Sequence, residues 1–325
     1  MAYLCSARTR QASSQCLNRR VVFLYTLMAI PFNKQYESPA YLAQLLQSRG
    51  LEMDSLSKAE TCLKRYGYYR LSAYWHPLLQ MPKTAHVFKP GASLDQTLML
   101  YSFDAQLRLF IFKEISKIEI AVRSAIVNII SRETGDMFWM TNSSWFMDQP
   151  RFSRSMVLIQ NEYDRSSEDF VQHFKQTYCD PFPPAWILAE ILPLGTLTNI
   201  FRNFRVARIK KLVAKEFDLS LPVFDSWMNI IAVTRNSCGH HSRVWNKVFS
   251  FNARLESNMI HPWVSNRVQQ GRIFFTLCII KYFVDLIDPE NDMLTRLRWL
   301  FVDYPQIDKH AMGFPDNWEL EPLWR

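Results

Sequence analysis

Apolar residues recur every three or four positions along most of the chain, a spacing typical of amphipathic helices. The longest such segment covers residues 93–134, where one apolar stripe extends from Leu107 to Ile129. Ser93 begins this segment with a capping-box pattern, and Gly135 ends it. A helix of this length would extend for about 60 Å, so we expect a bend or break within it.

The same spacing, together with caps and breakers, predicts further helices. Ser38 and Pro39 suit the start of a helix that Gly50 ends, and Gly67 stops the next one. The remaining predicted helices are 38–49, 57–65, 153–177, 184–204, 207–216, 222–238 and 265–287. Because no run of alternating strands separated by hairpin turns occurs, the chain is predicted to be an all-α, multi-helix bundle.

The first 30 residues are open to more than one interpretation. Arg19 and Arg20 precede a mostly apolar run over 21–30 that is too short to span a bilayer. It resembles the apolar region of a signal peptide, although no small-x-small cleavage site follows it. We favour a disordered or non-native extension over residues 1–30, with Met28 as an alternative start. No later segment has 18 consecutive apolar residues, so no membrane partner is expected.

Glycine, charge and cysteine narrow the function classes. The nearest two of the eight glycines, Gly50 and Gly67, are 17 residues apart, which excludes both G-x-G-x-x-G and the G-x-x-x-x-G-K phosphate loop. The net charge of +8 fits a polyanionic partner, but it also fits an ordinary basic protein. The six cysteines include no C-x-x-C pair, so we expect reduced thiols in a cytoplasmic protein and no zinc or redox motif.

An arginine followed by two histidines is the strongest chemical signal. The apolar stripe of the predicted helix 222–238 continues onto Arg235, which is costly to bury unless it is paired or lines a cleft. His240 lies about 140° around an ideal helix from Arg235 and about 7.5 Å along it, so the two are poorly placed to act together. A bend near Gly239 would bring them together, or a second chain would supply the matching group.

Arginine and histidine without acidic neighbours suggest phosphodiester chemistry. A histidine can transfer protons near neutral pH, and an arginine holds phosphate oxygens. RNA carries its own nucleophile, the 2′-hydroxyl, so neither a metal nor a cofactor is expected. The alternative is that Arg235, His240 and His241 only tie helices together. A metal site on the adjacent histidines is weaker still, because adjacent residues point apart on a helix.

The segment Arg235-Asn236-x-x-x-His240-His241-Ser242-Arg243-x-Trp245-Asn246 resembles the signature of bacterial abortive-infection proteins of the AbiD/AbiF type, which belong to the HEPN superfamily. The likeness covers most of the chain from about Pro31. The other stretches that resemble this family are residues 63–75, Phe103-Asp104-x-x-Leu107-Arg108, Ile118-Glu119-x-x-x-Arg123, Gly195-Thr196-Leu197, and Met312-Gly313-Phe314-Pro315-x-Asn317-Trp318.

The resemblance implies a HEPN-like helical bundle in which residues 31–325 form a single Abi-like domain. Its N-terminal helical part would be 31–92 and its bundle 93–325. It also implies a homodimer with a composite site, metal-independent endoribonuclease activity, and a role in phage defence or as a toxin restrained by an RNA or protein antitoxin. Gly239 and Ser237 depart from the family pattern, where alanine and an aliphatic residue are usual, and either could alter the helix around His240.

We assign roles on this basis. His240 is the expected general base or acid, Arg235 holds the scissile phosphate, Asn236 orients the site, and His241 is a secondary candidate. The products would be a 2′,3′-cyclic phosphate and a 5′-hydroxyl. The alternative function is a non-catalytic module that binds RNA or an antitoxin.

Several basic and aromatic residues are candidates for RNA contacts, although ordinary solvated faces and aromatic packing explain them about as well. They are Lys64, Arg65, Tyr69, Arg70, Arg202, Arg205, Arg208, Lys210, Lys211 and Arg243, with Phe201 and Phe204 near the second group. Glu119 is four residues before Arg123 and would pair with it, or it would orient Arg235; Glu190 invites the same second interpretation.

Overall fold

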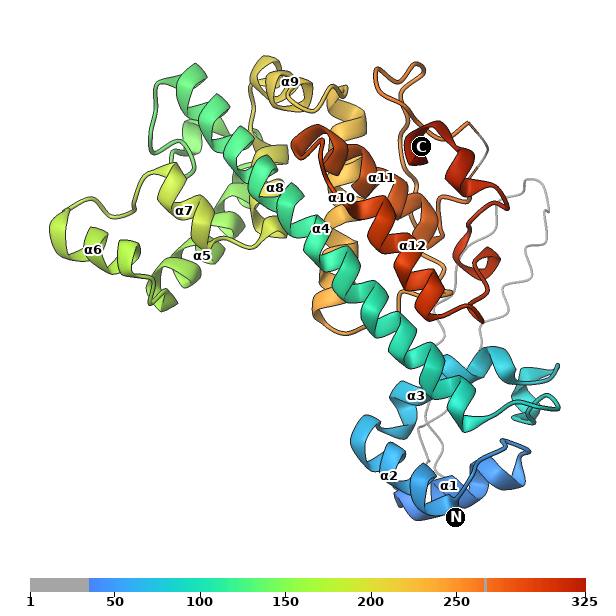
Figure 1. Ribbon diagram of the computed structural model, residues 1–325. Helices are drawn as coiled ribbons and strands as arrows, with labels where there is room; N and C mark the ends of the chain where they lie inside the picture. The colour runs from blue at the N-terminus through green and yellow to red at the C-terminus, as the bar shows by residue number, and fades with distance from the viewer. Residues whose placement is uncertain (1–34, 266–267) are drawn as a thin grey trace, which may run out of the picture. The chain divides into compact units, whose positions relative to one another are not determined.

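The longest element of the protein is one unbroken helix, α4 (Leu94–Thr134), in a computed structural model that describes residues 35–265 and 268–325. The Ser93 hydroxyl accepts a hydrogen bond from the backbone N–H of Gln96, and Gly135 ends the helix in the left-handed region at φ 67°. Both predicted caps are therefore confirmed. The expected break is wrong, because α4 contains neither proline nor glycine and packs against other helices along its length (Figure 1).

The described residues contain no strand, only isolated bridges, so the all-α prediction is confirmed. The other α-helices are α1 (Pro39–Ser48), α2 (Leu56–Tyr66), α3 (Tyr68–Trp75), α5 (Gln149–Arg165), α6 (Asp169–Thr177), α7 (Ala185–Ile191), α8 (Leu194–Asn203), α9 (Ala207–Lys215), α10 (Leu221–Gly239), α11 (Ile273–Ile287) and α12 (Met293–Asp303). Short 3-10 helices cover His76–Leu78, Lys83–Ala85, Ser143–Trp145, His310–Met312, Trp318–Leu320 and Pro322–Trp324.

Two predicted helices are each divided in two. Residues 153–177 are broken after Arg165, where Ser166 takes an extended conformation and its carbonyl accepts a hydrogen bond from the Gln172 side chain. Residues 184–204 are broken at Pro193, which has no N–H to donate and forces Leu192 into an extended conformation.

Two other regions also differ from the prediction. The helix predicted over 265–287 begins only at Ile273; residues 266–267 lie outside the described residues. The aromatic and basic stretch after Gly67 is helix α3, and α12 follows α11 as a helix that the spacing did not indicate.

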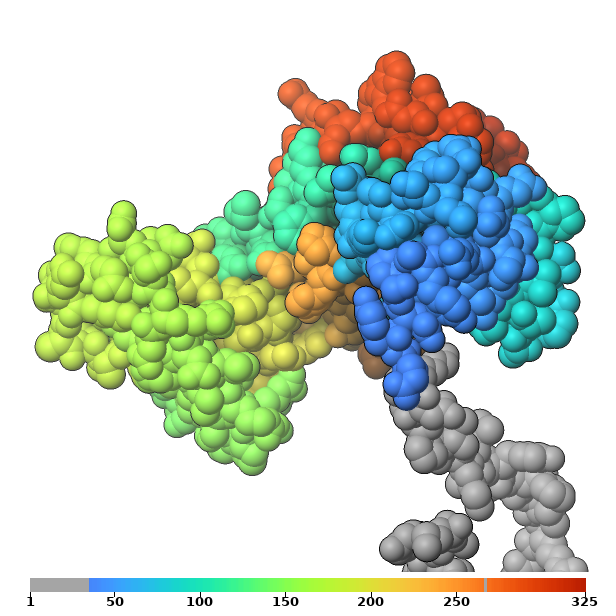
Figure 2. Space-filling model, turned by 90° about the horizontal axis from the view of Figure 1, so that it is seen from below, coloured from blue at the N-terminus to red at the C-terminus, as the bar shows by residue number. Residues whose placement is uncertain are grey.

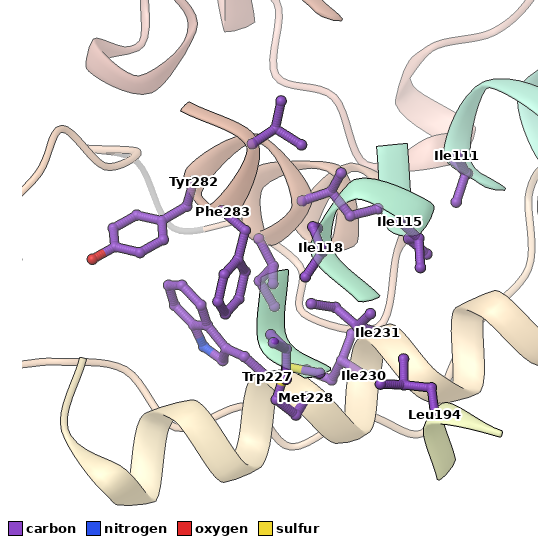
Figure 3. Close-up of a cluster of buried hydrophobic side chains, with 14 of the residues drawn as sticks. Ile111, Ile115, Ile118, Leu194, Trp227, Met228, Ile230, Ile231, Tyr282 and Phe283 are labelled. Atoms are coloured by element: carbon purple, nitrogen blue, oxygen red, sulfur yellow. The ribbon is translucent and has the colours of Figure 1, made fainter. Parts of the chain in front are cut away.

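The main core lies where α4, α10 and α11 meet (Figure 3). Ile111, Ile115 and Ile118 from α4 are fully buried there. Trp227 of α10 and Phe283 of α11 pack against each other with ring centroids 6.1 Å apart. The core therefore fixes the position of α10, the helix that carries Arg235.

A second apolar cluster is formed by α1, α2, α3 and the first residue of α4. It lies within the region predicted as the N-terminal helical part, but residues 39–325 form one compact unit and the boundary at residue 92 stays a prediction. The extension predicted over residues 1–30 lies outside the described residues. Within the described parts of the chain, no helix is both long and apolar enough to cross a bilayer.

The C-terminal segment closes over the start of α11. Gly313 has φ 87°, and a Cβ at this position would come within 2.5 Å of the Cβ of Arg272. The next residue, Phe314, packs against Phe274 with the ring centroids 4.4 Å apart and the rings tilted by 41°. Glycine is therefore required at 313 by both backbone conformation and close approach.

Candidate functional site

The Arg-His segment, residues 235–246, covers the end of α10 and the loop that follows. The backbone N–H of His240 still donates to the carbonyl of Asn236 at 2.9 Å, so the helix continues through Gly239 without a bend. His241 then takes a left-handed conformation at φ 55°, and the chain leaves the helix axis. The bend that would have brought Arg235 to His240 is therefore absent.

Arg235 is oriented but keeps its hydrogen-bonding capacity. Its Nε lies 3.6 Å from Oε2 of Glu119, and its guanidinium lies over the Phe112 ring at 5.6 Å from the centroid. The side chain is 35% exposed, and it makes no hydrogen bond within the described chain. Nε is buried beside Glu119, whereas the exposed part of the guanidinium can still donate hydrogen bonds to an anion.

Glu119 is itself held from the other side. Its Oε1 accepts a hydrogen bond from Nη2 of Arg123 at 2.8 Å, and Arg123 also donates to the carbonyl of Leu192 at 2.9 Å. Glu119 was expected either to pair with Arg123 or to orient Arg235. It contacts both, since Oε1 pairs with Arg123 and Oε2 faces Arg235. Glu190 is exposed on α7 and has no contact with Arg235.

The other candidate catalytic side chains are exposed. Asn236, His240 and His241 all lie on the surface, and none has a side-chain hydrogen bond in the described structure. No hydrogen bond or ion pair joins Arg235 to His240. The predicted residues lie at and just after the end of α10, and the structure does not join them into a closed site within a single chain.

Asp104 anchors the end of the Arg-His segment. Its carboxylate is fully buried, and Oδ1 accepts hydrogen bonds from the backbone N–H groups of Val244 at 3.0 Å and Trp245 at 2.6 Å. Oδ2 accepts from the Tyr74 hydroxyl at 2.6 Å and pairs with the buried Arg108. Every lone-pair direction of this carboxylate is thus used to connect α3 and α4 to the loop.

Asp104 and Tyr74 are functional residues for which the sequence predicted no role. The only signal was the resemblance of Phe103-Asp104-x-x-Leu107-Arg108 to a family pattern. The loop residues that bind Asp104, Val244 and Trp245, lie about 140 residues further along the chain, so local spacing alone cannot identify them.

Two of the arginines predicted to contact RNA form hydrogen bonds within the protein. Nη1 of Arg70 donates to the carbonyl of His241 at 2.9 Å, and Nη1 of Arg243 donates to the carbonyl of Ala73 at 2.6 Å. Burial lowers the pKa of Arg243. These two bonds connect α3 to the Arg-His segment, and Figure 2 shows the orange surface of that region beside the blue surface of the N-terminal helices.

The remaining candidates on α2 and α3 are accessible. Lys64 is exposed and pairs with Glu60, and Arg65 is exposed as well. Tyr69 is 92% exposed and precedes Arg70 on α3. An exposed aromatic ring of this kind can stack on a base of single-stranded RNA.

The basic segment 201–215 is mostly part of the scaffold. Phe201 and Phe204, which lie near these basic residues in the sequence, are buried in the core and are not accessible to bases. Arg202 donates to the backbone carbonyl of Asp225, and the buried Lys210 donates to the carbonyl of Arg202.

The exposed residues of this segment lie away from Arg235. Arg205 donates to the carbonyl of Ser144, Arg208 pairs with Glu133, and Lys211 is exposed without a polar contact in the described structure. Glu133 follows Glu119 by 14 residues on α4, which is about 21 Å along the helix. The segment therefore does not form one continuous stripe with the Arg-His segment.

The two departures from the family pattern leave the helix intact. Gly239 has helical backbone angles, and a Cβ built there would lie 3.9 Å from the Phe112 ring, an ordinary contact. Ser237 lies within the same regular helix. Neighbouring Cys238 is buried, which raises the pKa of its thiol to about 12 and leaves it no role as a nucleophile.

Residues 61–246 match the model of a protein family described as Abi-like protein. This range covers more than half of the chain, and it includes Asp104, Glu119 and the whole Arg-His segment. No curated protein and no solved structure matches the chain. In the parts of the chain that the structure describes, no three His, Cys, Asp or Glu side chains are grouped so as to hold a metal ion.

Proposed function

The chain belongs to the Abi-like protein family, and on that premise we propose that it is a metal-independent endoribonuclease of the HEPN type. It would act in phage defence by abortive infection, or as a toxin that an RNA or protein antitoxin restrains. The AbiD/AbiF subtype and the cytoplasmic location belong to this proposal as well.

The observation that carries the proposal is the state of Arg235. Its guanidinium is directed by Glu119 and Phe112 and makes no hydrogen bond, whereas Arg70 and Arg243 are occupied by backbone carbonyls. An arginine fixed in this way costs nothing to reorganise when a phosphate arrives. A merely structural arginine would be expected to donate at least one hydrogen bond within the protein, as Arg70 and Arg243 each do.

The reaction would be a transphosphorylation. His240 accepts the proton of the ribose 2′-hydroxyl, the 2′-oxygen attacks phosphorus, and the bond to the 5′-oxygen breaks as that oxygen is protonated. Arg235 neutralises the charge on the non-bridging oxygens, and Asn236 and His241 contribute hydrogen bonds. The products are a 2′,3′-cyclic phosphate and a 5′-hydroxyl.

A homodimer would complete the site. Arg235 and His240 are not in contact within one chain, and both reach the surface. Two copies that meet at the ends of their α10 helices would bring two histidines to one phosphate, one as base and one as acid. An antitoxin that covers the same surface would block this assembly.

The test is RNA cleavage by the purified full chain in excess EDTA, with the product ends identified. We expect cleavage by the wild type and a reduction of at least about 100-fold for both Arg235→Ala and His240→Ala. Matched controls are Arg132→Ala and His173→Ala, which change exposed residues away from this surface and should retain activity.

Three outcomes would count against the proposal. Absence of cleavage by the wild type, cleavage that requires an added metal ion, or equal cleavage by His240→Ala would each refute it. Salt-sensitive RNA binding without strand scission, which survives both substitutions, would favour the non-catalytic module instead. Growth arrest on expression, relieved by the double variant, would link the activity to toxicity.

A further inference from the structure

A polar cavity lies at the other end of α10 from His240. It has a volume of about 590 Å³, within the range of ligand pockets. Its wall is formed by the first turns of α10, by Arg202 of α8, and by the loop 250–254. The polar lining residues are Arg202, Asp225, Ser226, Asn229, Ser250, Asn252 and Arg254.

The charge around this cavity is predominantly positive. Arg202, Lys210, Arg151 and Arg254 all act on the single carboxylate of Asp225. Burial raises the pKa of Asp225 and lowers that of Arg202. Four cations against one acid leave an excess that favours an anionic ligand.

Arg254 is the cation that remains available. Its backbone N–H and carbonyl are bonded to Ser226 and Trp227, which fixes its position beside α10. Its side chain is exposed and has no ion pair or hydrogen bond in the described structure. Arg202, in contrast, already donates to the backbone carbonyl of Asp225.

The cavity and the Arg-His segment share one face of α10. The residues Asn229, Val233, Asn236 and His240 follow one another at intervals of three or four, and all are exposed. From Asp225 to His240 the helix rises by about 22 Å. A stacked strand, at about 3.4 Å per nucleotide, would cover that length with about six nucleotides.

We propose that the cavity formed by Arg202, Asn229 and Arg254 is a second phosphate subsite, which holds an RNA strand along α10 while a linkage of that strand lies at His240. The inference rests on the proposed function and adds a substrate class, single-stranded RNA of at least about six nucleotides. Arg254 binds a phosphate oxygen, and the amide of Asn229 and the carboxylate of Asp225 offer hydrogen bonds to ribose and base.

The test is binding rather than cleavage, so that its failure is separate from failure of the nuclease proposal. Affinity of the full chain for an uncleavable 2′-O-methyl RNA of ten nucleotides is measured by fluorescence anisotropy at several salt concentrations. We expect Arg254→Glu to weaken binding about tenfold and to reduce the salt slope by about one. Asn229→Asp is a second variant on the same face and should weaken binding in the same direction.

Arg165→Glu is the matched control, because it reverses an exposed cation at the end of α5, outside the cavity. The proposal is overturned if Arg254→Glu and Asn229→Asp bind the RNA no more weakly than Arg165→Glu. Binding of AMP to the same variants distinguishes a site for an RNA phosphate from a site for a free nucleotide. If AMP binding depends on Arg254 while RNA binding does not, the cavity is a site for a free nucleotide and the RNA subsite is refuted.

Discussion

Replacing the buried Asp104 by asparagine tests how the Arg-His segment is held in place. The carboxylate accepts hydrogen bonds from the N–H groups of Val244 and Trp245 and from Tyr74, and it neutralises Arg108. Asparagine keeps the volume of the side chain. It also places an NH₂ group where an acceptor is needed and leaves Arg108 buried without a counter-charge.

The expected cost follows from these contacts. A hydrogen bond to a charged group contributes about 1.5–3 kcal/mol, and breaking a buried ion pair costs about 3–5 kcal/mol. Because asparagine retains one acceptor oxygen, we expect Asp104→Asn to lower the free energy of unfolding by about 3 kcal/mol. We also expect faster amide hydrogen exchange over residues 240–246, since two of the bonds that hold this loop are weakened.

The assay is urea unfolding at pH 7, with two comparisons. Asp95→Asn changes an exposed, salt-bridged aspartate on the same helix and should have little effect. Adding Arg108→Met to Asp104→Asn removes the uncompensated charge, so the double variant should lose less stability than the sum of the single variants. A loss below about 1 kcal/mol for Asp104→Asn, or additivity within about 0.5 kcal/mol, would refute the reasoning.

Three further predictions concern other positions. Gly239→Ala should raise the free energy of unfolding by about 0.5 kcal/mol, because the backbone is helical and the Cβ has room; a clear loss in urea unfolding would contradict this. Gly313→Ala should lower the free energy of unfolding by more than about 2 kcal/mol, because strain at positive φ adds to the clash with Arg272. Gly50→Ala, at positive φ in open space, should lower it by about 1 kcal/mol. Equal losses for the two variants would argue against the clash. Although burial acts to raise the pKa of Asp136, three hydrogen-bond donors hold it below its ordinary value. The stability difference between wild type and Asp136→Asn should therefore be full above about pH 4 and disappear as the pH falls further, and a difference that persists in acid would be inconsistent with it.

The elements that the sequence predicts well are those defined by neighbouring residues. The start of α4 depends on Ser93 and Gln96, and its end on Gly135, so both can be recognised from a few positions. The division of residues 184–204 was missed although Pro193 marks it, because the apolar spacing continues on both sides of the proline.

In the candidate site, the contacts between residues far apart in the chain could not be predicted from the sequence. Arg235 was singled out because it continues an apolar stripe, and its pairing with Glu119 was one of two interpretations considered. The true partners of Arg70 and Arg243 are backbone carbonyls about 170 residues away, and a carbonyl has no sequence signature. The sequence therefore cannot distinguish an arginine that binds the protein backbone from one that is accessible to a ligand, and only the structure separates the two.

The continuity of α4 has a consequence for how the protein tolerates change. Asp104 and Glu119 lie 15 residues apart on the same continuous helix. Asp104 binds the backbone at the end of the Arg-His segment, and Glu119 lies beside Arg235 at its start. Inserting a single residue between them would turn one attachment point by about 100° relative to the other. Point substitutions on the solvent side of this stretch should be accepted freely, whereas any insertion or deletion there would detach the loop or misdirect the arginine.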